Sequence, residues 1–285
     1  MVSAVIAGRL LEVGVAVSDL QSASGHFSHW LRAPMSAPVE ERDAFGLRFT
    51  MCRVARADFE IMESLDSSGL VARFVARNGE GLHHIAFEIE DAEAAMRALR
   101  NAGVPVLGGP EPVRLANLKA FFIHPACFGG ILVEFVQNLH PWLDGVAYQR
   151  DGHPPGVDAR RIAGVTAVVS DVNAAIRAFC DLLGAQFLGP TVCRWIEGET
   201  RVCSVGDIEL TLVQASGANK TGLRFVTVEV DDLAASSSRL LARNARLRRA
   251  DSAGGTVTTV LVEHPDLHGV PIELIEPPAV LRRHA

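Results

Sequence analysis

The sequence predicts an α+β fold made of two similar modules, and three observations lead to this prediction. Four segments of the chain share one order of elements, in which a short alternating strand passes through an aspartate into a helix. About three further strands, separated by turn residues, follow each helix. Late motifs of the first half recur in the second half. The chain therefore reads as four βαβββ units, two in each half.

The repeated segments are recognised by strand alternation followed by an aspartate. Alternating apolar and small or polar residues have the two-residue period of a strand, and an aspartate after it is well placed to cap a helix. The helices that follow show apolar residues at a spacing near 3.6, and two are expected to end at Gly103 and Gly184. The segments are Leu11–Leu20, Leu82–Asp91, Ala163–Val172 and Arg224–Leu233.

A His-Pro pair followed by a glutamate also occurs once in each half. His124 precedes Glu134 by 10 positions, and His264 precedes Glu273 by 9 (134 − 124 and 273 − 264). Each His-Pro pair predicts a structural turn. The recurrence supports an internal duplication of the chain.

Proline and glycine gather between the two halves, as expected for a linker. The predicted organisation is a first module at residues 8–138, a linker at 139–160 and a second module at 161–280. Modules of this length suit two similar domains in one chain.

Composition excludes several classes of function. The net charge of −6 disfavours electrostatic binding of nucleic acid. The five cysteines are odd in number and form no Cys-x-x-Cys motif, so we expect a reducing, cytoplasmic location rather than disulfides or a thiolate zinc site. No apolar run approaches the ~20 residues that cross a bilayer, so we expect no membrane partner.

Two apolar strands carry costly polar side chains. His84 lies in Gly81–Ile89 and Glu134 lies in Gly129–Val136, and burying either residue is unfavourable unless both share a partner. Alternation places His84 on a face with small residues, which leaves room for a ligand. The neighbouring His83 falls on the opposite, helix-facing side, and this pattern predicts a structural role for it.

These segments resemble the vicinal oxygen chelate superfamily, which includes glyoxalase I, bleomycin-resistance proteins, extradiol dioxygenases and methylmalonyl-CoA epimerase. The paired βαβββ pattern covers nearly the whole chain. The N-terminal half is most similar to methylmalonyl-CoA epimerase, through Gly81–Glu88, Phe122–Pro125 and Gly129–Glu134. The resemblance implies half-open mixed β-barrels, with a glyoxalase-like metal site in the first module and a degenerate copy in the second.

The resemblance implies metal ligands at Glu12, Glu60, His84 and Glu134. Glu60 follows Glu12 by 48 positions and Glu134 follows His84 by 50 (60 − 12 and 134 − 84), as expected for paired units. Glu12 stands where the superfamily usually has a histidine, and Glu63 is an alternative to Glu60. This set has three carboxylates and one imidazole, and the three carboxylates repel one another unless a proton or a cation intervenes.

An oxygen-rich donor set favours a hard or borderline divalent ion, namely Mn, Mg, Fe(II), Co, Ni or Zn. The alternative is that Glu12 is a rim carboxylate and that the site has lost its metal. In the second half the matching positions are Gly164, Glu209, Phe225 and Glu273. Because these lack an imidazole, we expect this half to support the first, or else to bind an apolar ligand without metal.

The leading hypothesis for function is a metal-dependent glyoxalase- or epimerase-like enzyme. It would act on a small carbonyl or acyl-thioester substrate through an enediolate, with Glu134 and Glu60 as the catalytic pair and Glu12 as the alternative to Glu60. One alternative is a non-catalytic protein that binds a drug or metabolite, as bleomycin-resistance proteins do. A second is an extradiol-type dioxygenase. A small molecule is the expected partner in each case, and the chain is a possible homodimer.

Overall fold

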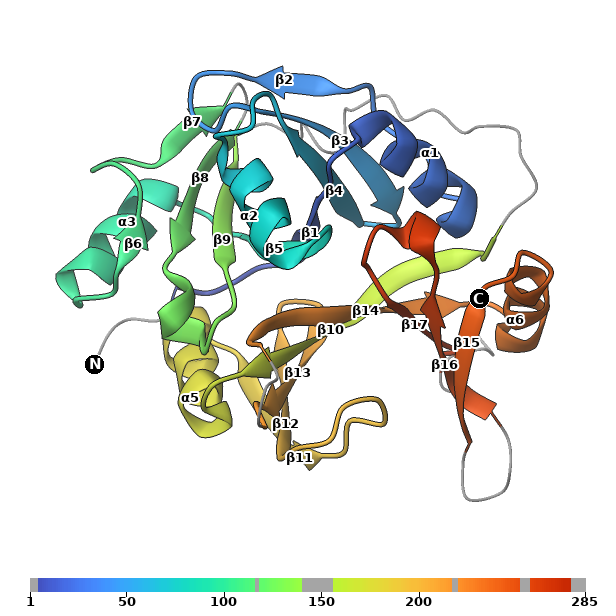
Figure 1. Ribbon diagram of the computed structural model, residues 1–285. Helices are drawn as coiled ribbons and strands as arrows, with labels where there is room; N and C mark the ends of the chain where they lie inside the picture. The colour runs from blue at the N-terminus through green and yellow to red at the C-terminus, as the bar shows by residue number, and fades with distance from the viewer. Residues whose placement is uncertain (1–4, 116–117, 140–155, 217–219, 252–256, 278–285) are drawn as a thin grey trace. The chain divides into compact units, whose positions relative to one another are not determined.

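The computed structural model describes residues 5–115, 118–139, 156–216, 220–251 and 257–277 (Figure 1). The strands in these residues form two mixed sheets, one from each half of the sequence. No helix in these ranges has the length and apolar character needed to cross a membrane.

The first sheet contains the strands of the two N-terminal units. Its order is β2-β3-β4-β1-β5-β9-β8-β6, and β7 pairs with β8. Strands β5 and β9 are parallel, whereas β8 and β9 are antiparallel. The strands are β1 (Leu10–Ala16), β2 (Val39–Glu41), β3 (Leu47–Val54), β4 (Ala57–Ser64), β5 (Gly81–Glu88), β6 (Val106–Leu107), β7 (Val113–Leu115), β8 (Leu118–Ile123) and β9 (Val133–Asn138).

The second sheet repeats this arrangement with the C-terminal strands. Its order is β11-β12-β13-β10-β14-β17-β16-β15, with β14 and β17 parallel and β16 and β17 antiparallel. The strands are β10 (Ala159–Val169), β11 (Gln186–Thr191), β12 (Thr200–Val205), β13 (Ile208–Gln214), β14 (Gly222–Val230), β15 (Arg246–Asp251), β16 (Val257–Glu263) and β17 (Ile272–Ile275).

The helix of each unit follows its first strand and packs on later strands of that unit. Helix α1 contacts β3 and β4, α3 contacts β8 and β9, α5 contacts β12 and β13, and α6 contacts β15 and β16. The predicted α+β fold, with four βαβββ units and sheets curled into half-barrels, is confirmed. These helices are α1 (Leu20–Leu31), α3 (Ala92–Asn101), α5 (Val172–Leu183) and α6 (Leu233–Leu241).

One helix, α2 (Leu70–Asn78), was not predicted from the sequence. It follows β4, and Val71 is its only buried residue. Its N-cap is Gly69, which makes no side-chain capping bond. The aspartate signal that marks the other helices is therefore missing here.

An aspartate caps the helix of every unit, as predicted. Each cap has an extended backbone conformation, and its carboxylate accepts a hydrogen bond of 2.7–3.0 Å from the backbone N–H three residues later. Such a cap contributes about 1 kcal/mol to helix stability. The caps are Asp19, Asp91, Asp171 and Asp232.

The two His-Pro pairs form the predicted turns. Nδ1 of His124 accepts from the N–H of Ala126 at 3.2 Å, and Nδ1 of His264 accepts from the N–H of Asp266 at 3.1 Å. These bonds cap two short 3-10 helices, η1 (Pro125–Phe128) and η2 (Pro265–Leu267).

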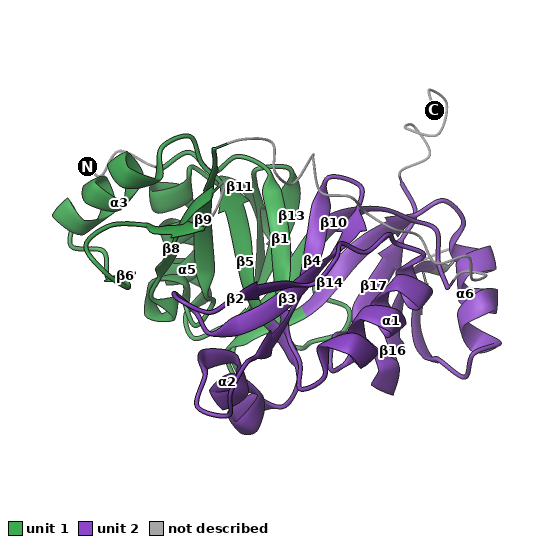
Figure 2. Cartoon of the chain, turned by 90° about the horizontal axis from the view of Figure 1, so that it is seen from above, with its two compact units in different colours: residues 1–14, 83–146, 164–224 green, residues 15–82, 147–163, 225–285 purple. Residues whose placement is uncertain are grey.

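By its internal contacts the chain separates into two compact units, and each draws on both halves of the sequence (Figure 2). Unit 1 comprises residues 1–14, 83–146 and 164–224, and unit 2 comprises residues 15–82, 147–163 and 225–285. The predicted modules follow the sheets rather than these units, so their boundaries stay a prediction. Most of the predicted linker lies outside the described residues.

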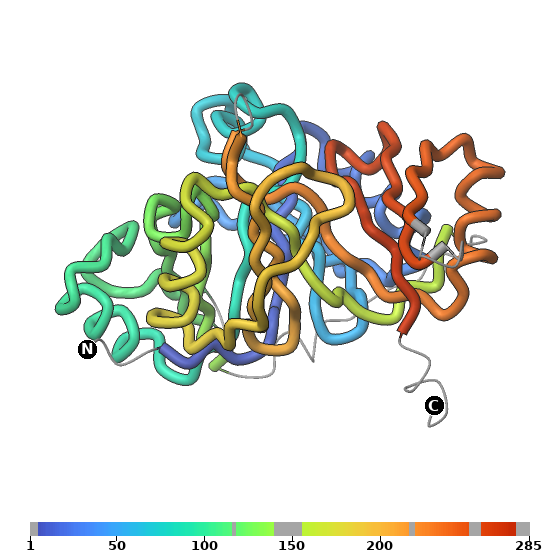
Figure 3. The backbone as a smooth tube through the Cα atoms, turned by 90° about the horizontal axis from the view of Figure 1, so that it is seen from below, coloured from blue at the N-terminus to red at the C-terminus, as the bar shows by residue number. Residues whose placement is uncertain are grey.

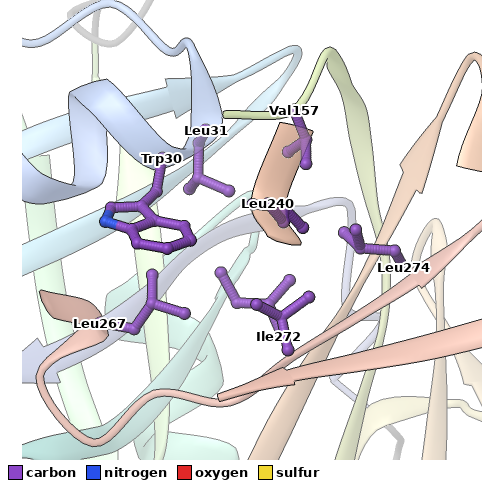
Figure 4. A pocket seen from close by; sticks show the side chains of 8 residues that line it. Trp30, Leu31, Val157, Leu240, Leu267, Ile272 and Leu274 are labelled. Carbon is purple, nitrogen blue, oxygen red and sulfur yellow. The ribbon is translucent and has the colours of Figure 1, made fainter. Parts of the chain in front are cut away.

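The core of unit 2 joins segments from the two ends of the chain. Helix α1 packs against η2 (Figure 3), and the ring centroids of Trp30 and His264 are 4.5 Å apart. Nearby side chains line a small hollow of about 10 Å³ (Figure 4). A void of this size holds at most one water, and its lining is almost wholly apolar, so it is a packing gap rather than a ligand site. The lining residues are Trp30, Leu31, Val157, Leu240, Val262, Leu267, Ile272 and Leu274.

A chain of hydrogen bonds in unit 2 centres on Glu80. Its carboxylate accepts from the backbone N–H of Ser18 at 2.7 Å and from the Ser18 hydroxyl, and Nδ1 of His268 lies 2.7 Å from its other oxygen. Nε2 of His268 in turn lies 3.0 Å from Nδ1 of His26. Burial alone would raise the pKa of Glu80, but the hydrogen bonds from Ser18 and His268 outweigh it, so its pKa lies below the ordinary value.

This network predicts a pH-dependent effect of the substitution Glu80→Gln. Because the folded state lowers the pKa of Glu80, the ionised carboxylate stabilises the fold at neutral pH, and that contribution disappears as the pH falls through the folded-state pKa. We expect the free energy of unfolding to fall by about 1 kcal/mol at pH 7. The difference should vanish in acid, as measured by urea denaturation across pH. The matched control Glu90→Gln, at an exposed position, should change stability little at any pH.

Candidate metal centre

The site begins with the alternation of β1, in which every residue is buried. Glu12, Gly14 and Ala16 share one face of the strand, while Val13 and Val15 share the other. Glu12 is only 7% exposed, although it carries a carboxylate. An otherwise apolar strand therefore brings one oxygen donor into the interior.

His84 and Glu134 come from β5 and β9, which pair in parallel. Glu134 lies opposite Ala86, two residues after His84, so both polar side chains share one face of the sheet. Nε2 of His84 lies 3.1 Å from Oε2 of Glu134, and the two residues are 2% and 6% exposed. The strand pairing thus produces a buried imidazole–carboxylate pair.

Glu12 completes a group of three donors with this pair. One ligand atom of each residue lies within 4.8 Å of the other two, and no second group of this kind occurs in the ranges that the structure describes. The strands β1, β5 and β9 are neighbours in the sheet. Donors bound to a divalent ion at ~2.0–2.3 Å lie roughly 3–4.5 Å apart, so this cluster fits a metal ion.

The His84 ring is held by its neighbours. An ideal Cβ added to Gly14 would lie 2.2 Å from both Cε1 and Nδ1 of His84, so only a glycine fits beside the ring at this point. Phe122 meets the ring edge-on, with centroids 5.4 Å apart and planes at 83°. The direction in which His84 presents its nitrogens is therefore fixed by packing.

His83 also contacts this ring, which alternation did not predict. Its Nδ1 lies 3.0 Å from Nδ1 of His84, and the two rings are nearly perpendicular. Burial and the adjacent His84 lower the pKa of His83 to about 3, so that it is neutral at ordinary pH. The adjacent pair of histidines in the sequence was the available signal, but the alternation rule assigned them to opposite faces.

The remaining predicted ligand, Glu60, lies on β4 opposite Met51 and is partly exposed. It belongs to unit 2, whereas the three clustered donors belong to unit 1, so its place in the ligand set stays a prediction. The alternative, Glu63, accepts from Arg48 at 2.7 Å and from the N–H of Leu20 at 3.0 Å. Glu63 is therefore engaged in a structural ion pair.

The matching positions of the second half are built differently. Phe225 is buried where the first half has His84, and Glu209 is exposed. The carboxylate of Glu273 accepts from the hydroxyls of Thr227 at 2.7 Å and Thr259 at 3.0 Å. Thr227 lies opposite Glu273, just as Ala86 lies opposite Glu134. The second half therefore has a hydroxyl donor beside its carboxylate at the position where the first half has an alanine.

Comparison with known proteins identifies the family of this chain. A family model described as the Glyoxalase/Bleomycin resistance protein/Dioxygenase superfamily matches residues 12–122. The N-terminal half is 37% identical over 132 residues to the ethylmalonyl-CoA/methylmalonyl-CoA epimerase of Cereibacter sphaeroides. The aligned region covers 46% of this chain and 98% of that protein. The chain belongs to this superfamily.

A further relative and a solved structure are also similar to this chain. The mitochondrial methylmalonyl-CoA epimerase of Homo sapiens is 29% identical over 133 residues, covering 46% of this chain and 74% of that protein. A mutant of 4-hydroxymandelate synthase from Streptomyces coelicolor superposes with a TM-score of 0.72 at 17% identity, covering 95% of this chain and 93% of that one. The second likeness shows the fold alone, and it extends over both halves of this glyoxalase-superfamily chain.

The contact between Gly14 and His84 predicts that Gly14→Ala destabilises the protein. The added methyl group has to displace a buried ring, which should lower the free energy of unfolding by about 1–3 kcal/mol. The matched control is Gly25→Ala in α1, where an added Cβ meets no atom within 4 Å. That change should stabilise the protein by about 0.5–1 kcal/mol. Urea denaturation of both variants makes the comparison, and equal stabilities would contradict the packing described for His84.

Proposed function

We propose that the chain is a metal-dependent enzyme that moves the proton on the carbon next to the carbonyl of a small acyl thioester. The observation that carries this proposal is the buried cluster of Glu12, His84 and Glu134 in the half that matches epimerases. The relative from Cereibacter sphaeroides is named for ethylmalonyl-CoA and methylmalonyl-CoA. A coenzyme A thioester of a short branched acid is therefore the proposed substrate class.

Three residues would hold the metal, namely Glu12, His84 and Glu134, and Glu60 is the proposed fourth ligand. Carboxylate oxygens with one imidazole suit Mn²⁺, Mg²⁺, Fe²⁺, Co²⁺, Ni²⁺ or Zn²⁺. When bound, the ion supplies positive charge beside the substrate oxygens on which negative charge develops. Burial of the three donors strengthens this attraction, because little water competes.

The carboxylates are the proposed proton carriers. Glu134 accepts the α-proton, and the electrons of the broken C–H bond move onto the carbonyl oxygen to give an enolate of the thioester. Glu60 fills its second role when it is protonated and not bound to the metal, and it then returns a proton to the opposite face of the same carbon as the C–H bond re-forms. The product is the other stereoisomer, and proton exchange with solvent resets the two carboxyl groups.

The donor types favour proton transfer over oxygenation. Non-haem Fe(II) oxygenases typically use two histidines and one carboxylate. The cluster found within the described residues has one histidine and two carboxylates instead. A dioxygenase is therefore the weaker candidate for this site.

The proposal predicts that the unmodified protein binds metal and exchanges the α-proton, and that substitutions in the donor cluster reduce these properties. Protein purified without added metal should hold a divalent ion and should exchange the α-proton of methylmalonyl-CoA with D₂O, as followed by ¹H NMR. His84→Ala should remove the metal, and Glu134→Gln should slow exchange by about 10²–10⁴-fold.

Glu209→Gln supplies the matched control, because it changes an exposed glutamate at the equivalent of Glu60 in the second half. Its metal content and exchange rate should equal those of the unmodified protein. Absence of both metal and exchange in the unmodified protein would contradict the proposal. Tight binding of an acyl-CoA that a chelator does not affect, with no exchange, would favour a binding protein instead.

A further inference from the structure

The nitrogens of His84 divide their contacts between two sides of the ring. Nε2 lies 3.1 Å from Oε2 of Glu134, within the donor cluster. Nδ1 lies 3.0 Å from Nδ1 of His83, outside that cluster. Nε2 therefore faces the proposed metal site, and Nδ1 faces the imidazole of His83.

A nitrogen that binds a metal must present a lone pair and cannot carry a proton. A neutral His84 that coordinates through Nε2 therefore carries its single proton on Nδ1. That N–H is directed at Nδ1 of His83, which can accept only if His83 carries its own proton on Nε2. The short contact thus fixes the tautomers of both rings once the metal is bound.

We propose that His83 is a positioning residue that accepts the Nδ1–H of His84 and so holds the Nε2 lone pair toward Glu12 and Glu134. This inference rests on the proposed function, because it assigns a role toward the same metal. Metal-bound histidines generally donate their second N–H to an acceptor that fixes ring orientation and tautomer, and loss of that acceptor weakens metal binding about 10–100-fold. Here the acceptor is the preceding residue of the same strand.

Packing makes the interaction directional. The ring of His84 lies directly against Gly14 of β1, and the ring of Phe122 packs edge-on against it. A rotation of His84 that broke the contact with His83 would therefore clash with a neighbour. The ring of His84 is therefore held by the polar contact of Nδ1 with His83 and by packing against Gly14 and Phe122.

Zinc binding by variants of the full chain tests the role of His83. His83→Phe keeps an aromatic ring but removes the acceptor, whereas His83→Asn retains an acceptor oxygen close to the position of Nδ1. We expect competition with a chromogenic chelator to show Zn²⁺ binding weakened about 10–100-fold in His83→Phe and largely restored in His83→Asn. His83→Leu provides a second acceptor-free variant in case the phenylalanine form does not fold.

Nuclear magnetic resonance gives a readout that does not depend on activity. In the Zn²⁺-loaded protein, the Nδ1–H proton of His84 should resonate downfield and exchange slowly with water. It should move upfield and exchange faster in His83→Phe or His83→Leu, but not in His83→Asn.

The outcomes separate this inference from the proposed function. If the unmodified protein binds neither Zn²⁺ nor any of the other five proposed ions through His84, judged against His84→Ala, the proposed function fails. If it binds Zn²⁺ through His84 but the acceptor-free variants keep the same affinity and the same Nδ1–H resonance, the role of His83 alone is overturned.

Discussion

The donor cluster of Glu12, His84 and Glu134 is the constraint on which the interior of the first sheet depends. Removing two carboxylates and an imidazole from water costs several kcal/mol per charge, and only mutual pairing or a cation offsets that cost. The 3.1 Å approach of His84 to Glu134 supplies one such pair. The small residues around the cluster follow from it, since Gly14 gives the ring its space and Ala86 lies opposite Glu134.

In the second half, hydroxyl groups stabilise the corresponding carboxylate. Glu273 occupies the position that matches Glu134, but threonine hydroxyls hydrogen-bond to its carboxylate. Phe225 is buried where a metal ligand would have to stand. The second sheet thus has one of these acids, at a partly exposed position, and an apolar ring in place of the imidazole. The chemistry of the chain is therefore expected in the first sheet.

The local features of the fold could be predicted because each has a short-range cause. The aspartate caps depend on one side chain and a backbone N–H three residues later, and the face of each donor depends on strand alternation. Three features lay beyond such rules. Helix α2 lacks a capping aspartate. The compact units combine segments from both halves of the sequence. The ring of His83 contacts that of His84, although alternation assigns the two residues to opposite faces of the strand. Each depends on contacts or ring orientations that a two-residue period does not encode.

The central claim is that three side chains of one sheet bind a single divalent ion. Crystals grown with Mn²⁺ and measured for anomalous scattering test it most directly. The cluster predicts one strong anomalous peak about 2.0–2.3 Å from a carboxylate oxygen of Glu12, a carboxylate oxygen of Glu134 and Nε2 of His84. The absence of a peak in the cluster at saturating Mn²⁺, whether or not a peak occurs elsewhere in the protein, would contradict it.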